Sequence, residues 1–139
     1  MNNASTSPPI IRVLCVDDLV DVTAALRMII GTDPSMLCVG CLSSANDLVA
    51  EVLGRQPRPD VMIVDASMPG RDPLSAIAEL ATRCPETRAI VFSGHDDEAF
   101  IDRATRAGAW SCVSKSSDPK AILHAVREVV ARGPRAAPL

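Results

Sequence analysis

Apolar runs alternate along this chain with segments in which apolar residues recur every three or four positions. The runs are apolar throughout and bounded by turn residues, which predicts buried strands of a parallel sheet. Strands are predicted at 11–16, 36–41, 61–64, 89–92 and 110–113, and helices at 20–30, 45–53, 74–83, 98–107 and 120–131. Five such pairs predict an α/β fold with right-handed crossovers and helices on both faces of one sheet.

Two aspartate-proline pairs mark helix starts that agree with these boundaries. Asp72-Pro73 and Asp118-Pro119 each offer an N-cap carboxylate followed by proline at the first helical position, where the missing amide hydrogen costs nothing. Ser44, with Asp47 three residues later, is a cap signal for the second helix. Capping chemistry and hydrophobic period thus predict the same elements.

The chain has the length and composition of one globular domain. Its 139 residues suffice for a single core but not for two ordinary domains. Hydrophobic residues make up 47% and charged residues 22%, which excludes a disordered or fibrous chain. The net charge of -3 argues against a general affinity for nucleic acid. We expect the domain to cover 10–132, between a tail at 1–9 and a tail or linker start at 133–139.

No segment of the sequence predicts insertion into a membrane, and the cysteines fit a cytoplasmic protein. No apolar run reaches the roughly 18 residues that a span needs, and the start MNNASTSPP lacks the regions of a signal peptide. Cys15 and Cys112 lie inside predicted strands, and five cysteines leave at least one unpaired. Cys38 and Cys41 are three residues apart on a predicted strand, so we expect them on opposite faces, where they cannot easily share a metal ion.

Five polar residues stand at the ends of four predicted strands. Asp17 and Asp18 close the first strand, Asp65 closes the third, Ser93 closes the fourth, and Lys115 follows the fifth. Alone, each would read as a cap or a turn residue. Together they fall on one edge of a parallel sheet, the edge where such sheets bind ligands. The sequence therefore predicts one site.

The charges of these residues predict a metal-dependent phosphoryl acceptor. At an effective dielectric constant near 20, two unit charges about 4 Å apart repel by roughly 4 kcal/mol, so three clustered carboxylates need a positive partner. Carboxylates suit Mg²⁺ better than a soft metal, and Lys115 can neutralise part of the remainder. An aspartate beside Mg²⁺, a lysine and the Ser93 hydroxyl is equipped to accept a phosphoryl group.

Four segments in this order and spacing resemble the receiver domain of two-component response regulators: VLCVDD, VDASMPGRD, VFSG and GAWSCVSK. The resemblance covers about residues 10 to 132, and the combined motifs are specific although each alone is weak. It implies a flavodoxin-like (βα)5 fold with sheet order 2-1-3-4-5. It also implies a signalling switch, phosphorylated by a sensor histidine kinase, that is no enzyme beyond its own phosphorylation and dephosphorylation.

The resemblance assigns roles to individual residues. Asp65 would be the phosphoacceptor and, with Asp18, would bind Mg²⁺ directly. Asp17 would bind the metal chiefly through water, and the backbone carbonyl of Ser67 would complete the ligands. Ser93 would be the switch hydroxyl and Lys115 the ion-pair partner of the phosphoryl group. His95 and Ser67 would flank the path of the hydrolytic water, and Met68-Pro69-Gly70 would shape the loop after the phosphoacceptor.

Three positions depart from the family pattern. The first is Pro73, which stands where a glycine is common and still suits a helix start. Ser116 stands where a proline with a preceding cis peptide is usual, and since a non-proline cis bond costs about 3 kcal/mol, we expect a trans peptide. Cys112 occupies the position of the switch tyrosine or phenylalanine, with Trp110 two residues earlier on the same predicted strand face. We therefore expect phosphorylation to act through Ser93 and the following loop on the fourth helix, with weaker coupling to the fifth strand.

Other classes of function fit the sequence less well. A haloacid dehalogenase phosphatase needs a second aspartate two residues after the first, but Ser67 stands there. A flavodoxin-like electron carrier needs a phosphate-binding loop where this chain has Asp17-Asp18. A receiver that is never phosphorylated and serves as a docking module is the main alternative.

The output of the domain stays open. Its end, KSSDPKAILHAVREVVARG, resembles receivers that precede a helix-turn-helix DNA-binding domain, and GPRAAPL reads like the start of a linker. DNA is thus expected as a partner only through an output domain outside these residues, and a homodimer remains open.

Overall fold

The computed structural model describes residues 9–94 and 97–133 as a single five-stranded parallel sheet wrapped by five helices. The strands are β1 (Ile11–Val16), β2 (Met36–Leu42), β3 (Val61–Asp65), β4 (Arg88–Ser93) and β5 (Ser111–Ser114). The helices are α1 (Val20–Gly31), α2 (Leu48–Gly54), α3 (Pro73–Arg83), α4 (Glu98–Ala107) and α5 (Pro119–Ala131). The strand order β2-β1-β3-β4-β5 confirms the predicted flavodoxin-like α/β fold.

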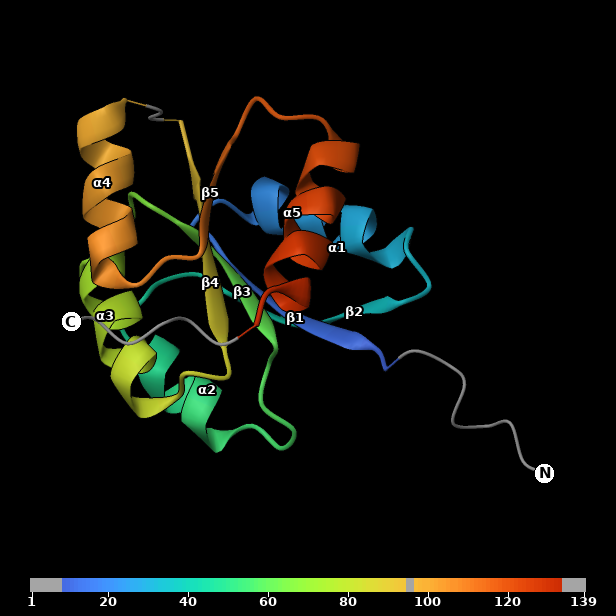
Figure 1. The fold of residues 1–139 in the computed structure, drawn as a ribbon, viewed down its shortest axis with the longest axis horizontal. Helices are drawn as coiled ribbons and strands as arrows, with labels where there is room; N and C mark the ends of the chain where they lie inside the picture. The colour runs from blue at the N-terminus through green and yellow to red at the C-terminus, as the bar shows by residue number, and fades with distance from the viewer. Residues whose placement is uncertain (1–8, 95–96, 134–139) are drawn as a thin grey trace.

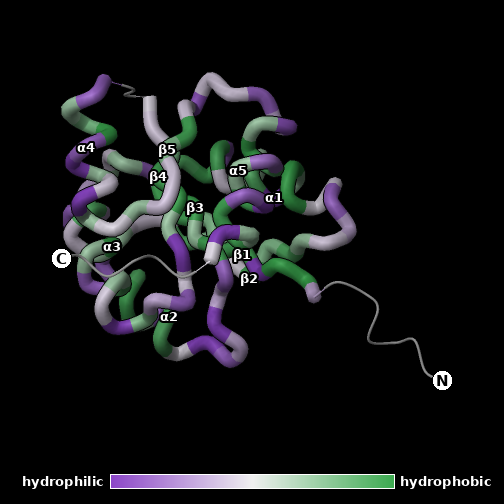
Figure 2. The backbone as a smooth tube through the Cα atoms, viewed as in Figure 1, coloured by the Kyte–Doolittle hydropathy of each residue, from purple (hydrophilic) through white to green (hydrophobic). Residues whose placement is uncertain are grey.

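The sheet separates two apolar layers (Figure 1). On one face, the strands pack against α1 and α5 through side chains such as Leu26 and Val126. On the other face they pack against α2, α3 and α4, with Val52, Leu80 and Phe100 in the contact. Apolar strands lie at the centre of the molecule, as a sheet covered on both faces requires (Figure 2). No helix in the described part of the chain is long and apolar enough to cross a membrane.

Capping aspartates begin three of the helices. Asp72 and Asp118 accept hydrogen bonds from the amides of Leu74 (3.1 Å) and Ala121 (2.9 Å), which confirms both aspartate-proline signals. Asp97 caps α4 in the same way.

The Ser44 cap signal is wrong. Ser44 Oγ accepts a hydrogen bond from the amide of Asn46 at 3.2 Å, and α2 begins only at Leu48, after an N-cap residue that makes no side-chain cap bond. The helix starts three residues later than predicted because Asn46 and Asp47, just before it, form a turn.

A β-bulge in β2 overturns the expectation for its two cysteines. Val13 pairs with Cys38 but Leu14 pairs with Gly40, so the register skips Val39. A bulge resets the alternation of side chains along a strand. Cys38 and Cys41 therefore both pack against the core beneath α1 and α5 instead of pointing to opposite faces.

Arg55, the residue that directly follows α2, supports this bulge. Its Nη1 donates a hydrogen bond to the carbonyl of Val39 at 3.0 Å. A Cβ atom at Gly40 would lie only 2.8 Å from Arg55 Nη2, so the glycine makes room for the guanidinium.

Trp110 is not on the strand face predicted for it. β5 begins one residue later, and Trp110 packs against the α1 and α5 core with the Arg88 guanidinium 4.0 Å from its ring centroid. Cys112 instead packs against the core under α2, α3 and α4. The prediction failed because Trp110 precedes the strand, where the alternation of side chains does not yet apply.

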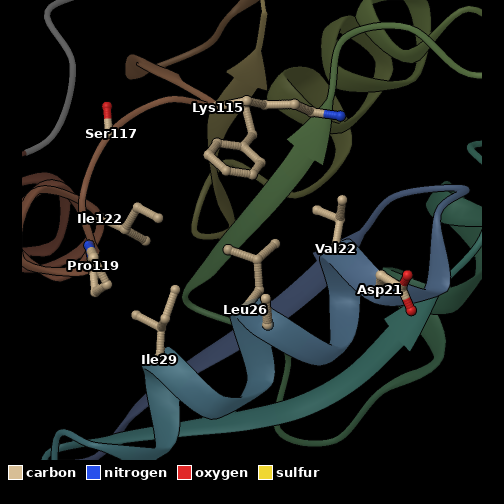
Figure 3. A pocket seen from close by; sticks show the side chains of 10 residues that line it. Asp21, Val22, Leu26, Ile29, Lys115, Ser117, Pro119 and Ile122 are labelled. Atoms are coloured by element: carbon tan, nitrogen blue, oxygen red, sulfur yellow. The ribbon is translucent and has the colours of Figure 1, made fainter.

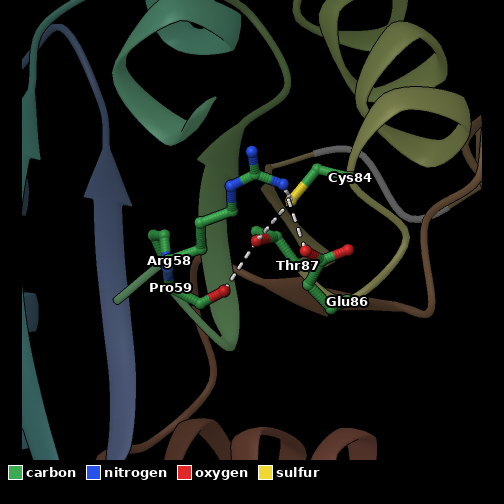
Figure 4. A network of polar contacts seen from close by, with 5 residues as sticks. All are labelled: Arg58, Pro59, Cys84, Glu86 and Thr87. Carbon is green, nitrogen blue, oxygen red and sulfur yellow. Dashed lines mark hydrogen bonds and ion pairs between the residues drawn. The ribbon is translucent and has the colours of Figure 1, made fainter. Parts of the chain in front are cut away.

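A polar network closes the edge of the sheet opposite to the predicted site (Figure 4). Thr87 Oγ1 donates to the carbonyl of Pro59 at 2.6 Å and lies 3.3 Å from Cys84 Sγ. Arg58 Nη1 reaches Glu86 at 3.1 Å and Cys84 Sγ at 3.7 Å. The network joins the segments that enter β3 and β4, and so supports the two strands that lead to Asp65 and Ser93.

Candidate functional site

Three aspartates meet at the carboxyl-terminal edge of the sheet. One carboxylate oxygen from each of Asp17, Asp18 and Asp65 lies within 4.8 Å of the other two. Asp17 directly follows β1, and Asp65 is the last residue of the neighbouring β3. Asp17 is 2% exposed and Asp65 is 4% exposed. The fold therefore places two buried negative charges side by side, as the strand pattern predicts.

Backbone contacts hold the Asp17 carboxylate in place but leave one of its oxygens unsatisfied. The Asp17 amide donates to the carbonyl of Leu42 at 3.0 Å, and Oδ1 accepts from the amide of Leu19 at 2.9 Å. Oδ2 is buried and accepts no hydrogen bond of good geometry, although the Lys115 ammonium is 3.1 Å away. A buried carboxylate oxygen with unused lone pairs suits a cation.

Lys115 bridges the two buried carboxylates. Its Nζ lies 3.1 Å from Asp17 Oδ2 and 3.3 Å from Asp65 Oδ1. Burial of the ammonium by itself disfavours its charge, but contacts with Asp17 and Asp65 outweigh this effect and raise the pKa of Lys115. The backbone amide of Lys115 also donates to the carbonyl of Ser93 at 2.9 Å, which anchors the lysine to the end of β4.

Asp65 is held in a setting that disfavours its charge. Burial raises the pKa of the Asp65 carboxyl, and the negative charge of Asp17 adds to the effect. A hydrogen bond from the amide of Ser67 to Asp65 Oδ1 at 3.2 Å and the nearby Lys115 act in the opposite direction without cancelling it. The ionised Asp65 is thus electrostatically strained until more positive charge arrives.

Ser93 ends β4, one residue beyond the partner of Asp65 in the β3–β4 ladder. It is 2% exposed and pairs with Ser114 across the sheet. Ser67 offers its amide to Asp65, while the metal role of its carbonyl stays a prediction. His95, the predicted neighbour of the hydrolytic water, lies outside the described residues.

The turn after Lys115 follows the sequence-based expectation of a trans peptide. Within residues 9–94 and 97–133 the one cis peptide bond is Gln56-Pro57. Ser117 donates its amide to the carbonyl of Ser114 at 3.0 Å, and the Ser116 amide donates to Ser114 Oγ at 3.1 Å. A serine-stabilised turn therefore leads from β5 to α5 in place of the usual lysine-proline segment.

The sequence analysis missed Asn46 as a support of the site. Its Oδ1 accepts a hydrogen bond from the backbone amide of Arg71 at 2.8 Å. A Cβ atom at Gly70 would lie only 2.5 Å from the same oxygen. Gly70 has a φ of +93°, which favours glycine. Asn46 thus ties the loop after β2 to the loop after β3. The sequence did contain a signal for this role, because Asn46 is a polar residue that follows the second strand at the same edge of the sheet.

An apolar pocket of about 290 Å³ lies beside the carbon chain of Lys115, between α1 and α5 (Figure 3). Its apolar lining includes Leu26, Phe92 and Ile122, and Asp21 and Ser117 also line it. The Lys115 ammonium points away from these apolar side chains and lies 5.9 Å from the Phe92 ring centroid. The pocket adjoins the carboxylate cluster, but most of its lining side chains are apolar.

The aspartate cluster fits a hard divalent cation. Among the residues that the structure describes, it is the one group of three potential metal ligands whose ligand atoms all lie within 4.8 Å of one another. Its potential ligand atoms are all carboxylate oxygens. Oxygen ligands of this kind match Mg²⁺ and exclude a preference for soft metals.

The match to a known family agrees with this geometry. The model of the response regulator receiver domain matches residues 13–127. This chain belongs to that family. Receiver domains are signalling modules of two-component systems, which is the class of function that the resemblance of the four sequence segments implied.

Curated relatives of the receiver come from transcriptional regulators. It is 33% identical over 122 residues to the DNA-binding transcriptional activator DevR/DosR of Mycobacterium tuberculosis, covering 86% of this chain and 54% of that protein. It is 29% identical over 123 residues to the uncharacterised transcriptional regulatory protein YxjL of Bacillus subtilis, covering 88% of this chain and 55% of the other. The receiver thus spans about half the length of these relatives.

Solved structures share the fold over most of their length. The response regulator domain of Thermotoga maritima CheB superposes with a TM-score of 0.81 at 26% identity, covering 90% of this chain and 99% of that one. A LuxR-family two-component response regulator from Aurantimonas sp. SI85-9A1 gives a TM-score of 0.81 at 27% identity, with coverage of 88% and 86%.

Proposed function

We propose that this receiver accepts a phosphoryl group on Asp65 from a phosphohistidine of a sensor histidine kinase and acts as a switch. Mg²⁺ would be held by Asp17, Asp18, Asp65 and the Ser67 carbonyl. The observation that carries the proposal is the pairing of a buried Asp65 with Lys115 at 3.3 Å, beside two further carboxylates that could share a cation. A receiver used only for docking would have no need of buried carboxylates in this costly arrangement.

The residues would divide the phosphoryl transfer among them. A carboxylate oxygen of Asp65 attacks the phosphorus, a new O–P bond forms, and the N–P bond to the donor imidazole breaks with its electron pair going to nitrogen. When bound, Mg²⁺ would neutralise the carboxylates and the charge on the transferring oxygens. Lys115 would then turn from Asp65 to a phosphoryl oxygen, and the Ser93 hydroxyl would donate a hydrogen bond to another.

Loss of the phosphoryl group would reset the switch. Water would attack phosphorus along a path flanked by Ser67 and His95. Ser67 lies two residues from the acceptor and is exposed, which supports such a position. The imidazole of His95 would tune this step by hydrogen-bonding the water or a phosphoryl oxygen.

We also propose that the output is transcriptional. The relatives named above are a DNA-binding transcriptional activator and a transcriptional regulatory protein, and the receiver matches about half of each. DNA would then be contacted by an output domain, not by this acidic receiver. A cytoplasmic location belongs to the same set of predictions.

Intact mass spectrometry after incubation with acetyl phosphate and Mg²⁺ tests the proposal. The wild type should gain the mass of one phosphoryl group, and Asp65→Asn should gain none. Asp102→Asn is the matched control because Asp102 is an exposed carboxylate on α4 that forms an ion pair with Arg106 on its own helix. It should be phosphorylated like the wild type.

Failure would have a definite meaning. If the wild type binds Mg²⁺ but gains no phosphoryl group, the domain is a docking module. If Asp65→Asn is phosphorylated as fully as the wild type, Asp65 is not the acceptor.

A further inference from the structure

Three cysteines gather under α1, on the side of the sheet away from α2, α3 and α4. Cys15 lies on β1 and is fully buried, while Cys38 and Cys41 lie on β2 and are partly buried. The bulge at Val39 turns both β2 cysteines to this face. Cys15 Sγ and Cys38 Sγ are 3.9 Å apart. The fold thus creates a thiol cluster that strand alternation in the sequence would exclude.

The surroundings of Cys38 favour its thiolate. The contact between Cys15 Sγ and Cys38 Sγ, in which either thiol can donate, is the main cause that lowers the pKa of Cys38 to about 6, while burial acts in the opposite direction. Arg27 adds positive charge to the cluster, and its Nη2 donates to Cys41 Sγ at 3.5 Å. Because Cys38 is also partly exposed, it combines the two features of a reactive cysteine.

The geometry favours a thiol pair over a metal site. Within the described residues, the aspartate cluster is the one set of three potential ligands whose atoms all lie within 4.8 Å of each other, so the three thiols do not form such a set. Cys15 and Cys38, in contrast, are in direct sulfur contact. A disulfide has an S–S distance of about 2.0 Å, so the two sulfur atoms would have to approach each other by about 2 Å to form the bond.

We propose that Cys38 and Cys15 form a reversible redox site that reacts with a hydroperoxide such as hydrogen peroxide. The Cys38 thiolate attacks one peroxide oxygen, the O–O bond breaks, and the products are a Cys38 sulfenic acid and hydroxide, which is protonated to water. The Cys15 sulfur then attacks the Cys38 sulfur, and the sulfenic oxygen leaves as water with the Cys15 proton. The two thiols lose two electrons, and a dithiol reductant restores them.

The two cysteines have different roles because their exposure differs. Cys15 is inaccessible, so peroxide reaches Cys38 first and Cys15 acts only as the resolving thiol. The product covalently joins β1, which ends beside Asp17, to the edge strand β2. This site uses none of the residues proposed for phosphorylation, so it stands or falls independently of that function.

Peptide mapping, with fragmentation of the cross-linked peptides to assign each cysteine, identifies the bond that forms. The reduced wild type is treated with hydrogen peroxide, the remaining thiols are alkylated under denaturing conditions, and the protein is digested with trypsin. Cys15 lies in the tryptic peptide 13–27, whereas Cys38 and Cys41 both lie in peptide 28–55. The proposal expects a cross-link between these two peptides through Cys38, two fewer alkylated thiols, and full reversal by dithiothreitol.

Matched variants show which thiol reacts. Cys38→Ser should abolish the cross-link, whereas Cys41→Ser and Cys112→Ser should keep it, the latter because Cys112 packs against the opposite face of the sheet. A bond within peptide 28–55, an intermolecular disulfide, or no loss of thiols in the wild type overturns the proposal. The wild-type map is decisive even where a variant fails to fold.

Discussion

The ammonium of Lys115 lies 3.3 Å from Oδ1 of Asp65, so the end of β5 supplies the positive charge for a carboxylate buried at the end of β3. The same Nζ is 3.1 Å from Asp17 Oδ2. Lys115 therefore lies among the same carboxylates that would attract Mg²⁺. Lysine and Mg²⁺ should oppose each other at this site, which has measurable consequences.

Replacing Lys115 by methionine should tighten Mg²⁺ binding while lowering stability without metal. The uncompensated carboxylates should reduce the free energy of unfolding by about 2 kcal/mol. Removing the nearby positive charge should strengthen Mg²⁺ affinity roughly tenfold. Urea unfolding in a chelator and Mg²⁺ titration by calorimetry measure the two effects. Lys120→Met, at an exposed position of α5, should change neither, and an unaltered Mg²⁺ affinity in Lys115→Met would contradict the competition.

Asp65→Asn should stabilise the metal-free protein at neutral pH. Because burial raises the pKa of Asp65, the folded state holds this proton more tightly than the unfolded chain. The bound proton stabilises the folded state fully at pH values below the pKa of Asp65 in the unfolded chain, about 3.9. This stabilisation is lost as the pH rises through the pKa of Asp65 in the folded protein.

The wild type should therefore fall behind Asp65→Asn as the pH rises from about 4 to 7, by on the order of 1 kcal/mol in the free energy of unfolding. Urea unfolding in a chelator across this pH range measures the difference. Asp102→Asn, at an exposed carboxylate, should show no comparable trend. A difference that shrinks with rising pH would show that the Asp65 charge is not disfavoured.

Gly70→Ala should destabilise the loop that follows Asp65. The φ of +93° is strained for alanine, and the added Cβ would lie 2.5 Å from Asn46 Oδ1, which accepts the Arg71 amide. We expect a loss of about 2 kcal/mol in the free energy of unfolding, measured with urea. Gly54→Ala, at the end of α2 with open space around it, is the control and should be neutral or stabilising. Equal effects at both glycines would refute the steric explanation.

Arg88 should hold the last turn of α5. Its Nη1 donates to the carbonyls of Val129 at 2.7 Å and Arg132 at 2.6 Å, and its guanidinium stacks on Trp110. Arg88→Ala should lose about 2 kcal/mol of stability and raise amide exchange at the end of α5. Arg88→Lys should not restore it, because an ammonium lacks the planar fork. Arg83→Ala, at an exposed pair with Glu79, should cost much less.

Phosphorylation should be reported more strongly by α4 than by β5. Cys112 stands at the family's aromatic switch position, is partly buried, and cannot swing between buried and exposed positions as a ring can. We expect amide chemical-shift changes on adding a phosphoryl mimic with Mg²⁺ to concentrate at Ser93 and α4. Asp65→Asn should show none of these changes. Large changes centred on Cys112 would show that coupling to β5 persists without the ring.

Much of this architecture could be read from local signals. The uniformly apolar runs predicted the five strands, and the three- to four-residue spacing of apolar positions predicted the five helices. Two aspartate-proline caps agreed with the helix starts, because burial and helix capping both depend on nearby residues. Two errors arose at the boundaries of elements. A turn at Asn46 and Asp47 delays the start of α2, and Trp110 precedes the strand to which the pattern assigned it.

The sequence by itself determined that Asp17, Asp18, Asp65, Ser93 and Lys115 share one sheet edge, because parallel strands align their carboxyl ends. Only the tertiary structure decided how they pair: Lys115 spans both buried carboxylates, which depends on side-chain distances that no spacing rule contains. The thiol cluster is the plainest case. A single skipped residue in the β1–β2 register reverses the face of Cys38 relative to Cys41, and register belongs to the pairing of two strands, not to either strand alone.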